Sequence, residues 1–245
     1  TGGVAPTKLH ANVAAPDRVL NVHVTADGDT VVFNTTANLF GAPAAGGAAA
    51  WPLDAAAAHP LVYGMKLSPD GKTLAFLDGT YDLYSVPVAG GSPVKLSSTG
   101  PVGSKVDANS LTFTPDSSRV LYVADHATLG VQELYSAPAK TAGGAMRPQP
   151  ALDGNRDVKP VLLVTKDSSR VVYMGNVLDA ADFEVLSSPV ATASTVTRVN
   201  NGFVPNGDIA SEYSVRLAAD GTMVVYLADA ELDGQIEAYA APITG

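Results

Sequence analysis

The chain has 245 residues, a formal net charge of −9 with only 15 Lys plus Arg, 46% hydrophobic residues and no cysteine. The hydrophobic content is sufficient for a sizeable core, and the scarcity of clustered basic residues argues against binding to nucleic acid or to an anionic membrane surface. Without cysteine there can be no disulfide, no thiol catalysis and no Cys-ligated zinc. No apolar run approaches the ~20 residues of a membrane helix.

An aspartate followed by a short apolar run recurs five times along the chain. The run begins four residues after the aspartate, and an aromatic residue lies six residues after it in every copy. The five aspartates are Asp27, Asp70, Asp116, Asp167 and Asp220. The best-formed copy is SPDGKTLAF, in which Asp70 precedes Leu74, Ala75 and Phe76.

A second sequence landmark recurs once after each copy of the first. It is an aromatic or Leu residue followed three positions later by proline, and it starts at Phe40, Tyr84, Tyr135, Leu186 and Tyr239. The prolines Pro43, Pro87, Pro138, Pro189 and Pro242 are separated by 44, 51, 51 and 53 residues. Two landmarks that stay in phase over five copies indicate an internal repeat.

Each repeat is predicted to contain four strands. The first ends at the Asp turn, as in 62–67 and 211–217, and the second is the apolar run. The third ends at the proline, where no ladder hydrogen bond is needed, and the fourth is a polar stretch such as 93–96 or 195–198. Asp in the turn is expected to accept backbone N–H groups, with Gly28, Gly71 and Gly221 supplying positive φ.

The two ends of the sequence complement each other. The last repeat stops after its third strand, whereas Ala5-Pro-Thr-Lys-Leu9 is similar to the fourth strand Ser92-Pro-Val-Lys-Leu96. The sequence therefore predicts an all-β fold, a single five-bladed β-propeller over residues 1–245. Its N-terminal strand is expected to complete the last blade and close the ring, because a closed ring leaves no unpaired sheet edge.

The repeat resembles the TolB-type propeller repeat, also called the WD-like or PD-type repeat. SPDGKTLAF and DLYSVPVAGGSPVKL carry the resemblance most closely, and the fourth copy departs from it, with KDSS and Leu186 in place of SPDG and the aromatic. The resemblance implies a bacterial periplasmic or extracellular protein, or the propeller of a prolyl-oligopeptidase-like hydrolase. Residues 1–10 contain no basic segment followed by an apolar run, so they hold no signal peptide.

Loops that break the repeat are the candidate binding sites. Those after the second strand are acidic, which suits either ordinary turns or a surface that binds a cation or a basic partner. An aromatic at a loop tip is a plausible contact for a partner, although Phe203 could equally tuck under its own loop. The predicted binding face comprises Tyr81, Asp125, His126, Asp179, Asp182 and Phe203.

Asp229-Ala-Glu231-Leu-Asp233-Gly234 resembles the opening of a calcium loop, with oxygen donors at positions 1, 3 and 5 and Gly at 6. The Glu expected at position 12 is replaced by Ala240, and Asp-Gly is also an ordinary hairpin turn. Calcium is therefore one of two interpretations, and no other cofactor is indicated.

Residues four positions before the repeat aspartates are expected to line a central channel. His23, Lys66 and Arg216 occupy this position and could bind an anion there, or serve as channel polar groups that water satisfies.

No catalytic signature is present: the sequence has no G-x-S-x-G and no H-E-x-x-H. The sequence therefore favours a non-catalytic binding or scaffold module that presents its loops to a protein or glycan partner. The alternative is the propeller of a carbohydrate-active enzyme or peptidase, with chemistry at the channel mouth or on another domain.

Overall fold

A computed structural model describes residues 6–9, 18–54, 63–193 and 195–245. The described chain is almost entirely strand and turn, and its single helical turn is the 3₁₀ segment η1, Glu212–Ser214. No helix in these parts is both long and apolar enough to cross a membrane. The all-β prediction is confirmed.

The strands form five antiparallel sheets in chain order, here called blades 1 to 5, in each of which neighbours in sequence are neighbours in space. Blade 1 holds β1 (Val19–Val24), β2 (Thr30–Thr35), β3 (Leu39–Pro43) and β4 (Trp51–Pro52). Blade 2 holds β5 (Met65–Leu67), β6 (Thr73–Leu77), β7 (Leu83–Pro87) and β8 (Val94–Lys95). Blade 3 holds β9 (Thr112–Phe113), β10 (Arg119–Ala124) and β11 (Glu133–Pro138). Blade 4 holds β12 (Val158–Val164), β13 (Arg170–Gly175), β14 (Glu184–Pro189) and β15 (Thr197–Arg198). Blade 5 holds β16 (Arg216–Leu217), β17 (Met223–Ala228) and β18 (Glu237–Pro242).

The Asp turn joins the first and second strands of each blade. In blade 4 the Asp167 carboxylate accepts a hydrogen bond from Thr165 Oγ1 at 2.6 Å and from the backbone N–H of Ser169 at 3.1 Å. The residue after the aspartate has positive φ in all five turns: Gly28, Gly71, Ser117, Ser168 and Gly221. The predicted turn chemistry is therefore present, with serine replacing glycine in blades 3 and 4.

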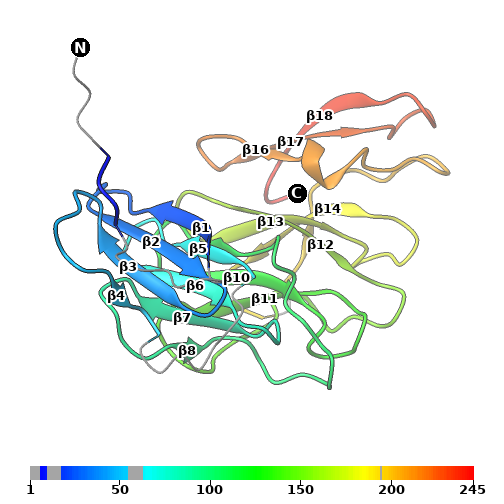
Figure 1. Ribbon diagram of the computed structural model, residues 1–245. Helices are drawn as coiled ribbons and strands as arrows, with labels where there is room; N and C mark the ends of the chain where they lie inside the picture. Colours follow the sequence, from blue (N-terminus) through cyan, green and yellow to red (C-terminus); the bar gives the residue numbers. More distant parts are fainter. Residues whose placement is uncertain (1–5, 10–17, 55–62, 194) are drawn as a thin grey trace, which may run out of the picture.

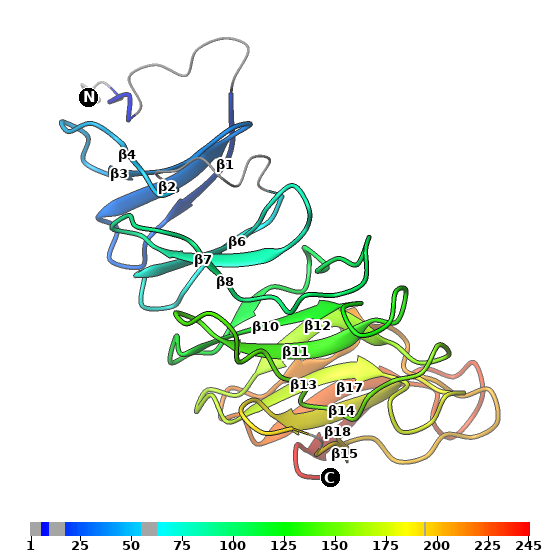
Figure 2. The ribbon, with the colours of Figure 1, turned by 90° about the horizontal axis from the view of Figure 1, so that it is seen from below.

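Neighbouring blades pack through alternate faces of their second strands. Between blades 2 and 3, for example, Ala75 and Leu77 pack against Val120 and Tyr122. Ala75 and Leu77 lie five and seven positions after the aspartate of their repeat, and Val120 and Tyr122 lie four and six positions after the aspartate of the next repeat. Between blades 4 and 5 the equivalent contact joins Val172 and Met174 to Val224 and Tyr226. The core is thus a row of similar inter-blade layers (Figure 2).

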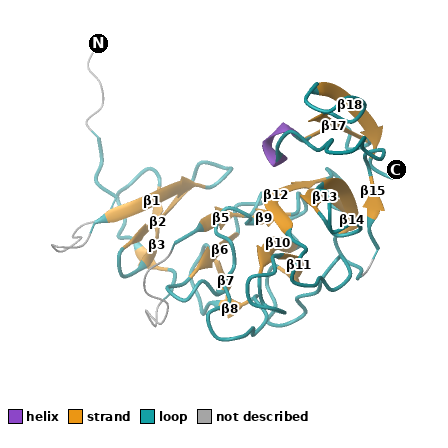
Figure 3. Ribbon diagram, turned by 90° about the vertical axis from the view of Figure 1, so that its right-hand side faces the viewer, coloured by secondary structure: helices purple, strands orange, loops and turns teal. Residues whose placement is uncertain are grey.

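The blades form an open arc with blade 1 at one end and blade 5 at the other (Figures 1 and 3). Among the described residues no strand joins the first sheet to the last, and the last sheet has three strands. Leu9, which the sequence assigns to the fourth strand of the last blade, packs on the apolar cluster of blade 1 that contains Val31 and Phe33. Closure of the ring by the N-terminal strand is therefore not seen in this structure.

Candidate binding face

Antiparallel connection of the strands places two sets of loops at the same end of every blade. These are the loops from second to third strand and the connections from one blade to the next. The Asp turns lie at the other end. We call the first end the loop face and the second the Asp-turn face. Figure 3 shows how the blades carrying these loops follow one another along the arc.

Acids at the ends of the second strands hold the loop face together. Asp125 accepts the backbone N–H groups of Lys105, at 2.6 Å, and Gly130, at 2.9 Å. Asp229 accepts those of Asp208, at 2.5 Å, and Gly234, at 2.8 Å. Each carboxylate therefore ties its own hairpin loop to the incoming inter-blade connection, and the turn interpretation accounts for both acids.

The same geometry bears on the calcium hypothesis. Both carboxylate oxygens of Asp229 already accept hydrogen bonds, while Glu231 and Asp233 are exposed to solvent. The described residues contain no group of three or more His, Asp or Glu side chains that could hold a metal ion. Calcium binding stays a prediction from sequence.

Negative charge gathers where blades 4 and 5 meet. Burial, together with the nearby charges of Asp229, Asp233 and Asp182, raises the pKa of Asp208. Asp182, Asp208 and Glu212 line a cleft of about 380 Å³ between the two blades. On its wall the Lys159 amine lies 4.2 Å from the centre of the Phe183 ring. Such a cleft favours a cationic group over an anionic one.

An exposed leucine lies in the loop from second to third strand of each of blades 3, 4 and 5. Leu129, Leu178 and Leu232 are exposed by 56%, 42% and 60%. Val102, in the connection between blades 2 and 3, is fully exposed. These residues were not predicted from the sequence, where the available signal was an aliphatic residue inside each acidic turn.

The other predicted face residues differ in accessibility. Tyr81 stacks on Tyr63 with ring centroids 4.7 Å apart and has Lys105 4.9 Å above its ring. His126 is buried, burial lowers its pKa, and its ring packs against the stacked pair Tyr122 and Tyr135. Phe203 is partly buried against the core of blades 4 and 5, which is the tucked arrangement.

Asp179 is exposed and caps its own turn by accepting the N–H of Ala181 at 3.0 Å. Asp182 is partly buried at the cleft.

The three channel candidates lie on the first strands of blades 1, 2 and 5. Arg216 donates to the carbonyl oxygens of Tyr213 and Val215 on its own segment. Lys66 is exposed and His23 half-buried, and within the described chain no hydrogen bond or ion pair joins any two of the three. An anion site at these three residues stays a prediction from sequence.

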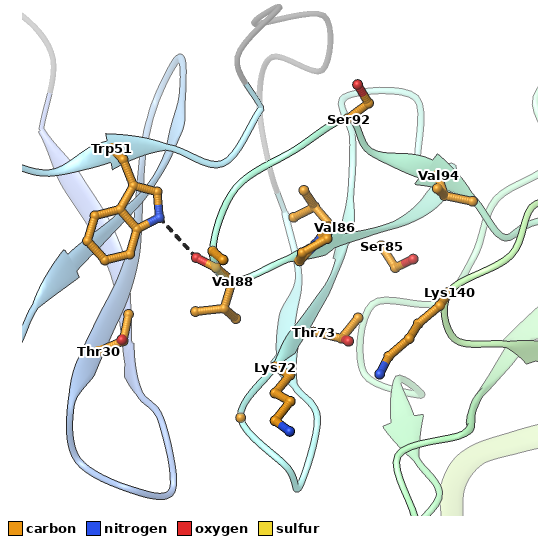
Figure 4. A pocket seen from close by; sticks show the side chains of 13 residues that line it. Thr30, Trp51, Lys72, Thr73, Ser85, Val86, Val88, Ser92, Val94 and Lys140 are labelled. Atoms are coloured by element: carbon orange, nitrogen blue, oxygen red, sulfur yellow. Dashed lines mark hydrogen bonds between the residues drawn. The ribbon is translucent and has the colours of Figure 1, made fainter.

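A second cavity, of about 630 Å³, lies on the Asp-turn face (Figure 4). Trp51 of blade 1 forms one wall and donates its indole N–H to the Val88 carbonyl at 2.9 Å. Lys72 of blade 2 and Lys140 of blade 3 enter from the other side. Sequence spacing does not predict this pocket, because its walls come from three different repeats.

No family model and no curated protein matches the chain. Solved structures do match. A structure assigned as TolB from Agrobacterium tumefaciens shares 17% identity at a TM-score of 0.54 over 94% of this chain and 79% of its own.

Two peptidases from other bacteria have the same fold. A puromycin-hydrolyzing peptidase of Mycobacterium tuberculosis gives 16% identity and a TM-score of 0.55 over 94% of this chain, which spans 37% of the peptidase. A dipeptidyl aminopeptidase IV of Bacteroides ovatus gives 13% identity and a TM-score of 0.62 over 93% of this chain and 39% of its own. The chain thus has the fold of the TolB-like β-propellers.

Proposed function

We propose that the chain is a binding module whose loop face holds a protein partner with a basic and apolar contact surface. The proposal is carried by two features of the loop face. Blades 3, 4 and 5 each present an exposed leucine there, and an acidic cleft lies between blades 4 and 5. The leucines are Leu129, Leu178 and Leu232. Exposed aliphatic side chains rimmed by charge are typical of protein interaction sites.

The chemistry of the face favours a protein over a glycan. Sugar rings usually stack on open aromatic faces, whereas Tyr81 and Tyr63 already stack on each other and Lys105 lies over Tyr81. Leucine and carboxylate together suit lysine or arginine side chains with apolar neighbours. The similarity to TolB supports a location outside the cytoplasm.

Charge is expected to act mainly on the rate of association. The chain carries a net charge of −9, so a basic partner is attracted over distances up to about the Debye length, ~8 Å at physiological salt. Binding should therefore weaken as salt is raised, while the apolar contacts persist.

A peptide selection tests the proposal directly, because the folded chain itself selects the ligands that its surface prefers. Peptides selected from a random library should be enriched in Lys, Arg and apolar residues. They should lose at least about tenfold in affinity when Leu178→Ser is combined with Asp182→Asn, because both contacts are removed.

The matched control removes charge from the opposite face. Lys72→Ser with Lys140→Ser alters the pocket of Figure 4 and should leave peptide affinity unchanged. Loss of binding in this control variant, with retention in the loop-face variant, would place the binding surface on the Asp-turn face and refute the proposal.

A second candidate function rests on the two peptidase structures, of which this chain spans 37% and 39%. In that case the chain is the propeller part of a hydrolase, and the loop face contacts a catalytic domain. Sequencing the reading frame on both sides of the coding segment tests this candidate, because it requires a hydrolase domain in the same frame.

A further inference from the structure

The pocket of Figure 4, here called the Trp51 pocket, has an apolar wall and a cationic end. The large apolar side chains of the wall are Trp51, Val86, Val88 and Val94. Lys72 lies in the Asp turn of blade 2 and Lys140 follows β11 of blade 3, and Figure 4 shows both below the apolar side chains. None of the described residues that line the pocket is acidic. Its volume of about 630 Å³ suits a small organic molecule.

The indole ring of Trp51 is held in one position by blades 1 and 2. Its N–H donates to the Val88 carbonyl of blade 2 at 2.9 Å. The ring also lies directly on Gly41 of blade 1, where an added Cβ would come 2.5 Å from it. Because the ring is already fixed, it loses little freedom when a ligand packs against it, and this favours binding.

The two lysines give the lower end of the pocket an excess of positive charge. Lys140 Nζ lies 3.9 Å from a carboxylate oxygen of Asp70, and both side chains are partly exposed. The other Asp70 oxygen accepts Ser68 Oγ at 2.5 Å and the Lys72 N–H at 3.0 Å inside the turn. In the described part of the chain, the Lys72 amine forms no ion pair with an acid. Two ammonium groups therefore have one paired carboxylate between them.

A second pocket at the same repeat positions offers a comparison. It has a volume of about 600 Å³ and lies between blades 4 and 5. Gly221 and residues 242–244 line it, and they correspond to Gly71 and residues 87–89 of the Trp51 pocket. Its charged residues are one base and two acids: Lys166, Asp167 and Asp220. The repeat thus forms a cavity at both junctions, but the described lining of the second cavity has neither an aromatic ring nor an excess of positive charge.

Glycine in the Asp turn distinguishes these two junctions from the others. Gly71 and Gly221 each follow a repeat aspartate and line the two pockets. In blades 3 and 4 the same position is Ser117 or Ser168, whose Oγ accepts the aspartate N–H of the preceding blade. At the glycine junctions no side chain makes this bridge, so the surface between neighbouring turns is open.

We propose that the Trp51 pocket binds a small organic acid, in which a carboxylate is attached to an aromatic or branched apolar body. The body packs against Trp51 and the valines, and the carboxylate pairs with the ammonium groups of Lys72 and Lys140. A cation of the same shape is rejected because it meets two like charges. The site lies at the opposite end of the blades from the loop face, so it does not depend on the proposed protein partner.

Nuclear magnetic resonance tests the proposal, because the chain has one tryptophan and therefore one indole N–H signal, that of Trp51. Three probes of similar shape differ in charge: phenylbutyrate, phenylbutanol and phenylbutylamine. Titration with phenylbutyrate should shift the indole signal until it saturates. Phenylbutylamine should bind at least about tenfold more weakly, and phenylbutanol should lie between the two.

Substitution of the lysines tests the role of charge. Lys72→Met with Lys140→Met removes both charges and keeps apolar stems. This variant should bind phenylbutyrate at least about tenfold more weakly and phenylbutanol within about twofold of the natural chain. Both lysines are exposed, so the variant should keep the natural fold. Lys166→Met, in the second pocket, is the matched control and should leave the phenylbutyrate affinity unchanged.

Three results would overturn the proposal. An indole signal that none of the probes shifts would show that the cavity takes no ligand of this shape. Equal affinities for the three probes, or equal phenylbutyrate affinity in the natural chain and the Lys72/Lys140 variant, would show that the amines do not select the ligand. Loss of the shift in Leu178→Ser/Asp182→Asn, which alters only the loop face, would place the ligand outside the Trp51 pocket.

Discussion

At the scale of single residues, the Asp turn explains why the repeat keeps its aspartate. The carboxylate gathers a hydroxyl and a backbone N–H inside the turn, and in two blades the turn also reaches its neighbour. Ser117 Oγ accepts the N–H of Asp70 at 3.0 Å, and Ser168 Oγ accepts that of Asp116 at 3.0 Å. Both serines have φ near +62°, where glycine is usual, so a hydrogen bond between blades offsets a strained backbone.

Substitution of Ser117 separates these two effects. Ser117→Ala keeps the positive φ and loses the hydrogen bond, so it should lower the free energy of unfolding by about 1 kcal/mol. Ser117→Gly loses the same bond but relieves the backbone, so it should stay within about 0.5 kcal/mol of the natural chain. Urea unfolding of both variants measures the difference. Equal stability of the alanine variant and the natural chain would mean that the bond contributes nothing.

The turn aspartates also predict acid lability. Hydrogen bonds from Thr25 and from Thr165 lower the pKa values of Asp27 and Asp167 below the ordinary 3.8. Their stabilising contribution is complete above the unfolded value of 3.8 and is lost as the pH falls through the folded values. The melting temperature should therefore fall as the pH is lowered from 5 to 2. The Asp167→Asn variant should melt at a lower temperature than the natural chain at pH 5, and its melting temperature should fall less between pH 5 and pH 2. An unchanged pH dependence in this variant would contradict the stabilising role of the ionised Asp167 carboxylate.

At the scale of the strand, an acid at or just before the start of the third strand pairs with a base that follows that strand in sequence. Burial differs between blades. Glu133 is fully buried and accepts from Arg147 at 2.8 Å, from the Leu152 N–H at 2.9 Å and from Tyr135 Oη at 3.1 Å. The Lys95–Asp82 pair is partly exposed at both ends.

Removing the base should therefore lower the free energy of unfolding by different amounts in the two blades. Arg147→Met leaves a buried carboxylate without its cation and should lower the free energy of unfolding by about 3 kcal/mol. Lys95→Met breaks a solvated pair and should cost less than about 1 kcal/mol. Denaturant unfolding of the two variants side by side provides the check. Similar costs would show that burial does not decide the strength of these pairs.

At the scale of the whole molecule, stability is the sum of similar inter-blade layers, and the two end faces decide whether the row is closed. Leu77→Ala, in a fully buried internal layer, should cost about 3 kcal/mol. Leu227 occupies the same position in blade 5. Leu227 is 40% exposed, so Leu227→Ala should cost less than about 1 kcal/mol. A cost near that of Leu77→Ala would contradict this prediction, because it would show that the Leu227 side chain is buried in solution.

The sequence by itself determined the Asp turns, the second and third strands of every blade and the succession of antiparallel sheets. Each of these depends on contacts between residues close in the chain, such as Thr165 with Asp167, so local spacing is sufficient to reveal it. The predicted fourth strand is absent from the described sheets of blades 3 and 5. The leucines of the loop face escaped prediction because a single apolar residue in a turn has no periodicity. The turn roles of Asp125 and Asp229 were recognised only as one alternative, since their N–H donors include residues about twenty positions away.

Only the tertiary structure decided which distant groups meet. The stacking of Tyr63 on Tyr81, the burial of His126 and the meeting of Trp51 with Lys140 each depend on the rotation from one blade to the next. That rotation is set by side-chain volumes across each inter-blade layer, summed over the row. Residue spacing repeats whether the row closes or stays open, so the sequence could match Leu9 to Leu96 but could not fix the distance between the two ends.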